Sequence, residues 1–375
     1  NTPTNTPTPT VTPTPTVTPT VTPTVTPTPS TSPTPIYDFV TTWFVSSMFP
    51  ITLPLIPLGT YSFTVNWGDG NTDFINTWNS PQATHTYVAN GNYTVTISGT
   101  IEGWSFNSSP STKYITSVVS WGPLKLGNDG FNFTNCRNLD LSLVVDVLDL
   151  SGTFNLKRVF AGCQTLTTIN NVELWDTSSV ITFQEAFVKD VNFNDDLSDW
   201  DMSNVQNTSG MFASCIDFNN GGSSLINNWD VSTVFDMSGM FSSCIHFNQP
   251  IGNWIMSSVT DISNMFAGAS VFNQNITTWN TINVTNMNGV FANAVVFEQN
   301  LSSWNISNVT TMFNMFANIS LSTTNYNALL VGWAAQTVQP DVTFDGGNSF
   351  YSAFPSAASV ARNTLTSGPN NWIIN

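Results

Sequence analysis

The sequence predicts a multi-domain protein in which an extended Thr/Pro-rich stalk precedes a β-sandwich and an α/β solenoid. Three observations predict this order. Prolines recur at every second to fourth position at the start of the chain, short alternating apolar runs with glycine turns follow, and tryptophans then recur about every 25 residues. We expect four parts: a stalk over 1–35, a sandwich over 36–110, a repeat solenoid over 111–320 and a C-terminal cap over 321–375.

The stalk, residues 1–35, consists almost entirely of threonine, proline and valine. Proline removes backbone donors and forces the preceding residue toward extended geometry, so helices and central strands are excluded. The composition predicts a stiff polyproline II-like spacer, which its threonines suit to O-glycosylation. A plain disordered linker fits the same composition.

Residues 36–110 show the period-two alternation of half-buried strands. Apolar side chains alternate over 61–67 and again over 93–97, and the turns Gly68-Asp69-Gly70-Asn71 and Asn90-Gly91-Asn92 separate such runs. Glycine and asparagine accept the positive φ that tight hairpin turns require. This pattern predicts a small antiparallel sandwich.

Three motifs in this part carry a family resemblance. Trp67-Gly68-Asp69-Gly70, His85-Thr86-Tyr87 and Gly91-Asn92-Tyr93-Thr94-Val95 together resemble the signature of a PKD-type immunoglobulin-like domain. The resemblance implies that these residues shape the sandwich.

The central part repeats itself in register. One column of the repeat is tryptophan and a second is phenylalanine. The columns are Trp175, Trp200, Trp229, Trp254, Trp279 and Trp304, and Phe187, Phe212, Phe241, Phe266, Phe291 and Phe316. A unit of about 25 residues cannot close its own core, so units must bury their apolar columns against the units above and below.

Each unit is expected to have an extended side and a helical side. The segment around Trp-Asp-Val-Ser is predicted to be extended, whereas apolar residues three to four apart around Met-Ser-Gly-Met-Phe predict a short helical turn. The units are similar to those of the BspA-like leucine-rich repeat proteins with DUF285-type repeats, in which PKD-like domains precede the repeats. The resemblance implies a leucine-rich-repeat-like solenoid in a surface protein.

The C-terminal segment breaks the repeat. Helices are predicted over 326–333 and 356–365, and strands over 342–344 and 372–374. A solenoid needs an atypical end to cover its last apolar unit, so we interpret 321–375 as a cap.

The four cysteines share one column, three residues after a repeat phenylalanine: Cys136, Cys163, Cys215 and Cys244. Ala269 and Ala294 take the same position later, which favours small buried side chains and free thiols. Disulfides between neighbouring units remain an alternative if the units stack at strand spacing. The spacing is unlike that of zinc sites.

No catalytic constellation is predicted. His85 and His246 lie far apart in sequence, and the carboxylates after the repeat tryptophan, Asp176, Asp201 and Asp230, give way later to Ile255, Asn280 and Asn305. A column that changes in this way indicates a polar stripe more than an acid–base pair. Asp69 is a weak calcium candidate, with turn stabilisation as the alternative. We expect no cofactor and no enzymatic activity.

Charge limits the partners. The chain has 7 basic and 23 acidic residues, a net charge of −16, and only 8% charged residues against about 25% in an average soluble protein. An acidic chain does not fit nucleic acid or an anionic membrane, and no apolar run is long enough for a membrane helix. We expect an extracellular protein of a cell or virion surface that binds a protein or glycan on another surface. The alternative is a structural subunit of a fibre, appendage or virion decoration that binds copies of itself.

Overall fold

A computed structural model describes residues 37–46, 49–107 and 109–375. The stalk predicted over 1–35 lies outside the described residues. Residues from Ile36 to Asn375 form one compact unit, and the fold below is that of this unit.

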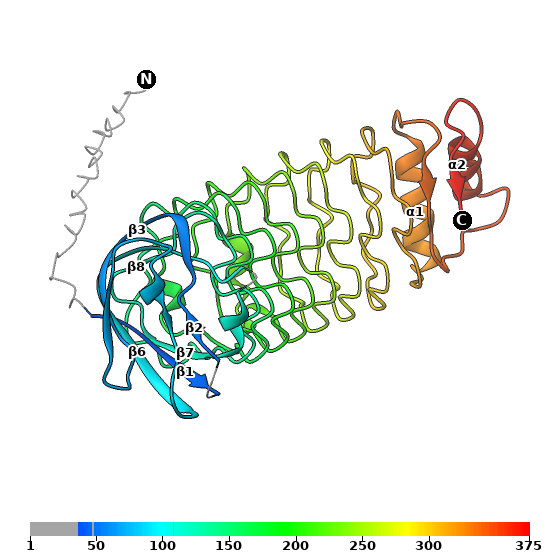
Figure 1. The fold of residues 1–375 in the computed structure, drawn as a ribbon. Helices are drawn as coiled ribbons and strands as arrows, with labels where there is room; N and C mark the ends of the chain where they lie inside the picture. Colours follow the sequence, from blue (N-terminus) through cyan, green and yellow to red (C-terminus); the bar gives the residue numbers. More distant parts are fainter. Residues whose placement is uncertain (1–36, 47–48, 108) are drawn as a thin grey trace, which may run out of the picture. The chain divides into compact units, whose positions relative to one another are not determined.

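The N-terminal part is built on a six-stranded sheet with the order β4-β3-β6-β1-β7, in which β8 also pairs with β6. A two-stranded ribbon, β2 with β5, accompanies this sheet (Figure 1). The strands are β1 (Phe39–Val45), β2 (Ile51–Thr52), β3 (Leu55–Asn66), β4 (Thr72–Ile75), β5 (Thr84–His85), β6 (Gly91–Trp104), β7 (Ile115–Ser120) and β8 (Leu124–Lys125). Pairing is antiparallel except between β6 and β8.

Alternation along the strands explains which face is buried. In β1 every second side chain is buried, so Phe39, Thr41 and Trp43 face the core while their neighbours are more exposed. The same alternation places Phe63 and Val65 of β3 inside. Period-two patterning is what a sheet with one covered face requires.

After the sheet, successive repeat units lie one against the next through isolated parallel β-bridges. A continuous series of bridges joins residues one unit apart: Asn155 to Thr182, Thr182 to Asn207, Asn207 to Asp236, Asp236 to Asp261, Asp261 to Asn286 and Asn286 to Thr311. The bridge from Ser117 to Asp140 connects β7 to this stack, and the bridge from Met312 to Phe344 connects the stack to the C-terminal part. Further backbone hydrogen bonds join the same units beside each bridge, such as Phe241 N–H to the carbonyl of Met265, so the stack is held by parallel contacts between neighbouring units.

The predicted leucine-rich-repeat-like α/β solenoid is wrong. Among the described residues both α-helices lie after residue 320, and the regular strand pairing of the molecule is mostly antiparallel and N-terminal. The repeats contain turns, single bridges and the short 3-10 helices η3 (Val172–Leu174), η4 (Asn220–Gly222) and η5 (Ser224–Asn228) where we expected helical turns and strands. Two further 3-10 helices, η1 (Pro81–Ala83) and η2 (Pro110–Lys113), lie in the N-terminal part.

Backbone hydrogen bonding explains why the Met-Ser-Gly-Met-Phe segments do not become helical. The N–H groups of Gly239 and Phe241 donate to carbonyls of the next unit, those of Ser263 (2.7 Å) and Met265 (2.9 Å). The N–H of Met240, between them, closes a four-residue turn inside its own unit by donating to the carbonyl of Met237 (3.2 Å). An α-helix needs every N–H for its own i−4 carbonyl, so this alternation excludes one.

The backbone conformation excludes a helix independently. Two positions in each unit, two residues before and two residues after the column phenylalanine, have positive φ; around Phe241 these are Gly239 (62°) and Ser243 (60°). Right-handed helices cannot contain left-handed residues. Apolar spacing of three to four residues arises here from tight turns, and periodicity alone does not separate the two.

The C-terminal part contains α1 (Thr323–Ala334), β9 (Thr343–Phe344), α2 (Ala357–Thr366) and β10 (Ile373–Ile374), where the sequence predicts helices and strands. Ser322 and Ser356 cap the two helices, because each side-chain hydroxyl accepts a hydrogen bond from an N–H of the first turn. β9 and β10 pair in parallel, so β9 joins the last repeat bridge to the end of the chain.

One continuous apolar core extends from β1 to the C-terminal residues. It includes all twelve residues of the predicted tryptophan and phenylalanine columns. The described residues contain no helix that has both the length and the apolar character for crossing a bilayer.

Candidate functional site

The phenylalanine column forms an unbroken ladder of stacked rings. Ring centroids from Phe187 to Phe316 follow one another at 5.6 to 5.9 Å, with nearly parallel planes. A second ladder, Phe193, Phe218, Phe247, Phe272 and Phe297, runs beside it at 6.0 to 6.2 Å. Each buried phenylalanine contributes roughly 2–3 kcal/mol of transfer free energy to stability. Stacking of the rings sets the spacing between neighbouring units.

The tryptophan column is also buried and serves the core. Three pairs stack at 6.0 to 6.1 Å: Trp175 with Trp200, Trp229 with Trp254, and Trp279 with Trp304. From Trp200 onward every column indole Nε1 donates to a carbonyl of the preceding unit, for example Trp254 to Ile226 at 2.9 Å. These indoles are at most 4% exposed, so they are not a surface for carbohydrate stacking.

All four column cysteines are buried free thiols. The Sγ atoms of Cys163, Cys215 and Cys244 donate to the carbonyl of the column phenylalanine one unit earlier, at 2.8 to 3.1 Å. Burial raises the pKa of each thiol well above its ordinary value, so thiolate chemistry is suppressed. The column is structural.

Asp190 takes the cysteine position in the unit between Cys163 and Cys215. Its side chain is 0% exposed; one carboxylate oxygen accepts the N–H of Cys163 at 2.7 Å, and the other, Oδ2, has no partner among the described residues. Burial raises the pKa of this carboxyl well above its ordinary value. An uncompensated buried carboxylate is costly, so the protonated form is favoured.

The repeat aspartates lie at the surface and close local turns. Oδ1 of Asp176, Asp201 and Asp230 accepts the N–H of the serine two residues later, at 2.9 to 3.1 Å. Asn305 does the same in a later unit, which explains why asparagine replaces aspartate there. Hydrogen bonds from Ser178 and Ser232 lower the pKa of Asp176 and Asp230, so these groups are anionic caps.

Asp69 and His85 form the polar centre of the Trp-Gly-Asp-Gly and His-Thr-Tyr motifs. His85 Nε2 lies 2.8 Å from Asp69 Oδ2, and the imidazole stacks on Trp67 at 4.8 Å. Burial alone would raise the pKa of Asp69, but hydrogen bonds from His85 and Asn71 outweigh it and lower the pKa. Both carboxylate oxygens are thus engaged in stabilising the turn, and the described residues contain no group of three or more metal-ligand side chains.

The second histidine lies elsewhere. His246 Nδ1 is 3.1 Å from Asp217 Oδ1 of the preceding unit, and both side chains are about half exposed. Among the described residues His246 makes no hydrogen bond to His85 or to a cysteine thiol. This pair is a surface contact between units.

Hydrogen bonds between side-chain amides and the backbone continue along one edge of the stack. Asn219, Asn248 and Asn273 each accept a backbone N–H from the next unit, at 2.9 to 3.0 Å. Gln274 and Gln299 donate back to the backbone carbonyls of Asn248 and Asn273. Amide ladders of this kind satisfy unpaired backbone groups without using charge.

One face of the stack carries a groove, which we call the repeat groove. Three cavities of about 150, 420 and 500 Å³ occupy it, mostly at the positions from three residues before to two residues after the column phenylalanines. The side chains there are small or polar: Arg158, Ala161, Gly162, Glu185, Val188, Lys189, Ser209, Gly210, Ala213, Asp236, Ser238, Gly239, Ser263, Asn264, Ala292, Asn293, Asn314, Ala317 and Asn318.

Charge in the repeat groove is concentrated at its N-terminal end. Arg158 pairs with Glu185 and lies 5.6 Å from the ring of Phe131. No lysine or arginine occurs between residues 190 and 361, so the rest of the groove presents amides, hydroxyls and the carboxylates of Asp236 and Asp345. Such a lining suits ligands that are neutral or positively charged.

Several of these features were not identified from the sequence. Asp190 is detectable by register, because it lies three residues after Phe187 as the cysteines do after theirs. The repeat groove has only a weak signal, the glycine or asparagine two residues before the column phenylalanine. The sequence gives no signal that the carboxylates of Glu102 and Asp129 share a cavity near the sheet, because they lie in separate segments of the chain.

Comparison with known proteins adds a family. The family described as "Mycoplasma protein of unknown function, DUF285" matches residues 131–225 and 222–333, which together span more than half of the chain. No curated protein and no solved structure matches. The matched segments are the stacked units that carry the aromatic ladders and most of the repeat groove. The chain therefore belongs to the DUF285 family.

Proposed function

We propose that the chain is a non-enzymatic surface or adhesion protein, located outside the cell on a cell or virion surface, that presents its repeat groove to a protein or glycan on another surface. The observation that carries the proposal is the recurrence of one set of groove positions in successive units. A repeated binding surface gains affinity by multiplying weak contacts along its length.

The repeat-turn carboxylates and the buried Asp190 also support a binding role over a catalytic one. Asp176 and Asp230 are anionic turn caps, and Asp190 is fully buried and does not line the cavities of the repeat groove. A general acid–base pair needs two carboxyl groups facing one substrate with separated pKa values. Nucleic acid is a poor partner because the net charge is −16.

We further propose that the N-terminal part is a PKD-like domain of a BspA-like protein. The motif residues support this, because Trp67, His85 and Tyr87 pack together and Tyr87 Oη donates to the carbonyl of Trp67 at 2.9 Å. Trp67 Nε1 also donates to Asp73 at 2.9 Å. In this arrangement the domain precedes the stack in the chain and packs against its first units.

The test is a binding screen with the full chain on arrays of glycans and extracellular proteins. Replacing Ser238 and Ser263 in the groove with arginine should weaken binding to any captured partner on the order of tenfold or more, because two long cationic side chains fill the cavity. In the matched control, arginine replaces Ser232 and Ser257, which lie in surface turns outside the groove lining. This variant should bind the partner as the wild type does. Equal loss in both variants, or no partner on any array, contradicts the proposal.

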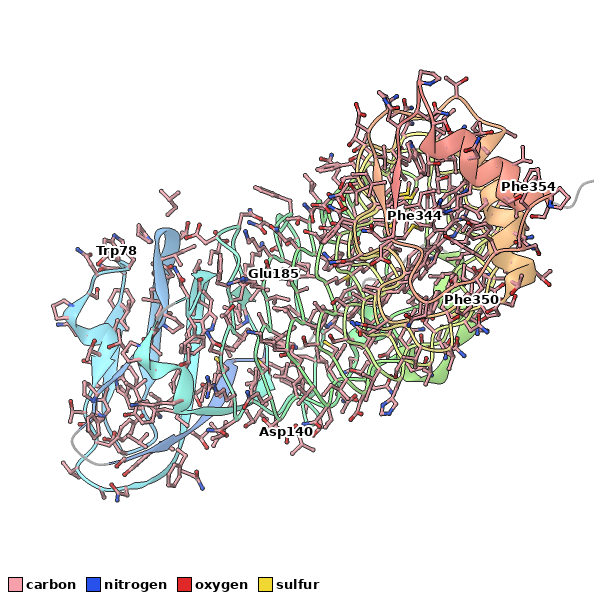
Figure 2. All side chains as sticks on the ribbon, turned by 90° about the vertical axis from the view of Figure 1, so that its right-hand side faces the viewer. Trp78, Asp140, Glu185, Phe344, Phe350 and Phe354 are labelled. Atoms are coloured by element: carbon pink, nitrogen blue, oxygen red, sulfur yellow. The ribbon has the colours of Figure 1, made fainter. Side chains whose placement is uncertain are left out.

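A structural role in a fibre, appendage or virion decoration is the alternative. It is favoured by apolar side chains exposed on the loop between β9 and α2, where Phe350 is 77% and Phe354 is 81% exposed (Figure 2). Exposed aromatic side chains of this size are typical of contact surfaces. Light scattering separates the two functions, because the adhesin is expected to be monomeric and the structural subunit to assemble.

A further inference from the structure

A separate cavity lies where the N-terminal sheet meets the first units of the stack, and a bulge in β3 forms part of its wall. In the pairing of β3 with β6, Leu55 is opposite Trp104 and Thr60 is opposite Glu102, so residues 56–59 of β3 face a single residue of β6. The segment from Ile56 to Gly59 therefore loops out of the sheet. Bulges of this kind re-aim side chains at functional edges.

Tyr61 holds the bulge in one conformation. Its Oη accepts the N–H of Ile56 at 2.8 Å and lies within hydrogen-bond distance of two carbonyls, those of Ile56 (3.1 Å) and Gly103 (2.9 Å). Burial raises the pKa of Tyr61 to about 12, and the nearby charge of Asp129 adds to the increase. The loop is thus braced by a buried neutral phenol, and the cavity beside it is preformed.

The cavity measures about 470 Å³ and is lined from four separate segments. β3, β6 and β8 supply one side, and two turns of the first units supply the other. The lining residues that carry the argument are Ile56, Leu58, Glu102, Lys125, Asp129 and Gly152. Leu58 is 90% exposed at the rim, while Ile56 is buried at 7%.

Two carboxylates in this cavity are unpaired. Among the described residues neither the side chain of Glu102 nor that of Asp129 has a hydrogen bond or an ion pair. The one cation of the lining, Lys125, lies 3.9 Å from Asp149, which is outside the lining. Counting these four side chains, the charge at the cavity is three negative and one positive, a net of −2, which disfavours phosphate, sulfate and carboxylate ligands.

We propose that this cavity receives an arginine side chain from a basic partner protein. The aliphatic stem would lie along Ile56 and Leu58, and the guanidinium would bind the carboxylates of Glu102 and Asp129. A guanidinium matches carboxylates with paired N–H donors and is less strongly hydrated than an ammonium, so a half-enclosed acidic pocket selects it. The long apolar stem matches a cavity with one apolar wall.

The charge distribution of the whole chain fits the same partner. The segment from 190 to 361 has no lysine or arginine, and the chain carries −16 overall, so a basic protein is attracted from a distance and an acidic one is repelled. This inference goes beyond the proposed function, because it assigns a second binding site, separate from the repeat groove, to a basic partner.

Saturation-transfer NMR tests the pocket with the full chain and a blocked glycine peptide that carries one central arginine. The peptide should bind, and Glu102→Gln with Asp129→Asn should weaken it about tenfold or more, because charge-assisted hydrogen bonds are lost while shape is kept. A peptide with citrulline, which is isosteric and neutral, should bind no better than the double variant. Asp230→Asn removes a repeat-surface carboxylate, keeps the turn acceptor as Asn305 does, and should have no effect.

Each outcome of this experiment either supports or overturns the arginine assignment. Equal binding of the arginine and citrulline peptides, equal binding by wild type and the double variant, or binding only of calcium ions or amino sugars overturns the arginine assignment. Loss of peptide binding in the double variant, with the surface partner from the array screen still captured, sustains the pocket and assigns that capture to the repeat groove. If only the groove variants lose array binding, the peptide result for the pocket still stands. The two proposals can therefore fail independently.

Discussion

Asp190 interrupts a column that cysteine or alanine occupies in the neighbouring units. Thiols there donate to a phenylalanine carbonyl of the preceding unit, as Cys215 does to Phe187. A protonated carboxyl at position 190 carries an O–H donor, as a neutral thiol carries an S–H, whereas a carboxylate has no donor. The titratable groups facing it in this column are the thiols of Cys163 and Cys215, which burial keeps neutral.

Replacing Asp190 with asparagine should therefore stabilise the protein in a pH-dependent way. The pKa of Asp190 is raised in the folded state, so its contribution to stability is fully present below its unfolded value, 3.8, and is lost as pH rises toward the folded pKa. Asparagine keeps the shape and never ionises. The stability difference between Asp190→Asn and wild type should be near zero below pH 4 and grow by up to about 1.4 kcal/mol per pH unit above it.

Urea denaturation from pH 4 to 8 measures this difference. Asp230→Asn is the control, because hydrogen bonds lower the pKa of Asp230 and its stabilising effect is lost only as pH falls below 3.8. A difference for Asp190→Asn that does not change with pH would show that the carboxyl is not a buried neutral acid.

At the scale of the repeat element, one backbone position controls the turn. Gly239 has φ of 62°, and the equivalent residues Asn264 and Asn314 have 55° and 57°. A Cβ added at Gly239 would find its nearest neighbours, including Gly210 Cα, no closer than 4.0 Å. Space is available, so the conformation alone decides which residues are tolerated there.

Gly239→Ala should destabilise the protein by about 1–2 kcal/mol, since alanine pays the full steric cost of left-handed backbone. Gly239→Asn should cost less than half as much, because asparagine tolerates that region and already occupies it in two units. Thermal or urea unfolding of the two variants provides the comparison. Alanine as stable as asparagine would contradict the turn geometry.

The same backbone explains why the sequence predicted the repeat columns and not the fold between them. Burial of Trp254 or Phe266 follows from periodicity, which any stacked arrangement satisfies. The choice between a helix and a series of turns depends on whether Gly239 donates its N–H within its own unit or to Ser263, and periodicity does not contain that information. Both helices were predicted, but α1 begins three residues before the predicted start, because Ser322 caps it; Ser356 caps α2 close to its predicted start.

At the scale of the whole molecule, the units share one interior. Rings stack at 5.8 Å between Phe266 and Phe291, and parallel bridges join each unit to the next. Neither site discussed above is visible in a single unit: the repeat groove requires several units, and the cavity of Glu102 and Asp129 requires the sheet and the first turns together. Sequence alone reveals chemistry within a motif, and here the chemistry lies between motifs.

Deleting one whole unit tests this shared interior most directly. Removal of residues 255–279 joins Trp254 to Asn280 in register, whereas removal of residues 255–266 leaves the later columns out of register. We predict that the whole-unit deletion unfolds in urea in one cooperative transition with a native near-ultraviolet circular dichroism spectrum, and that the half-unit deletion loses both. Equal disruption by the two deletions would contradict the stack of interchangeable units.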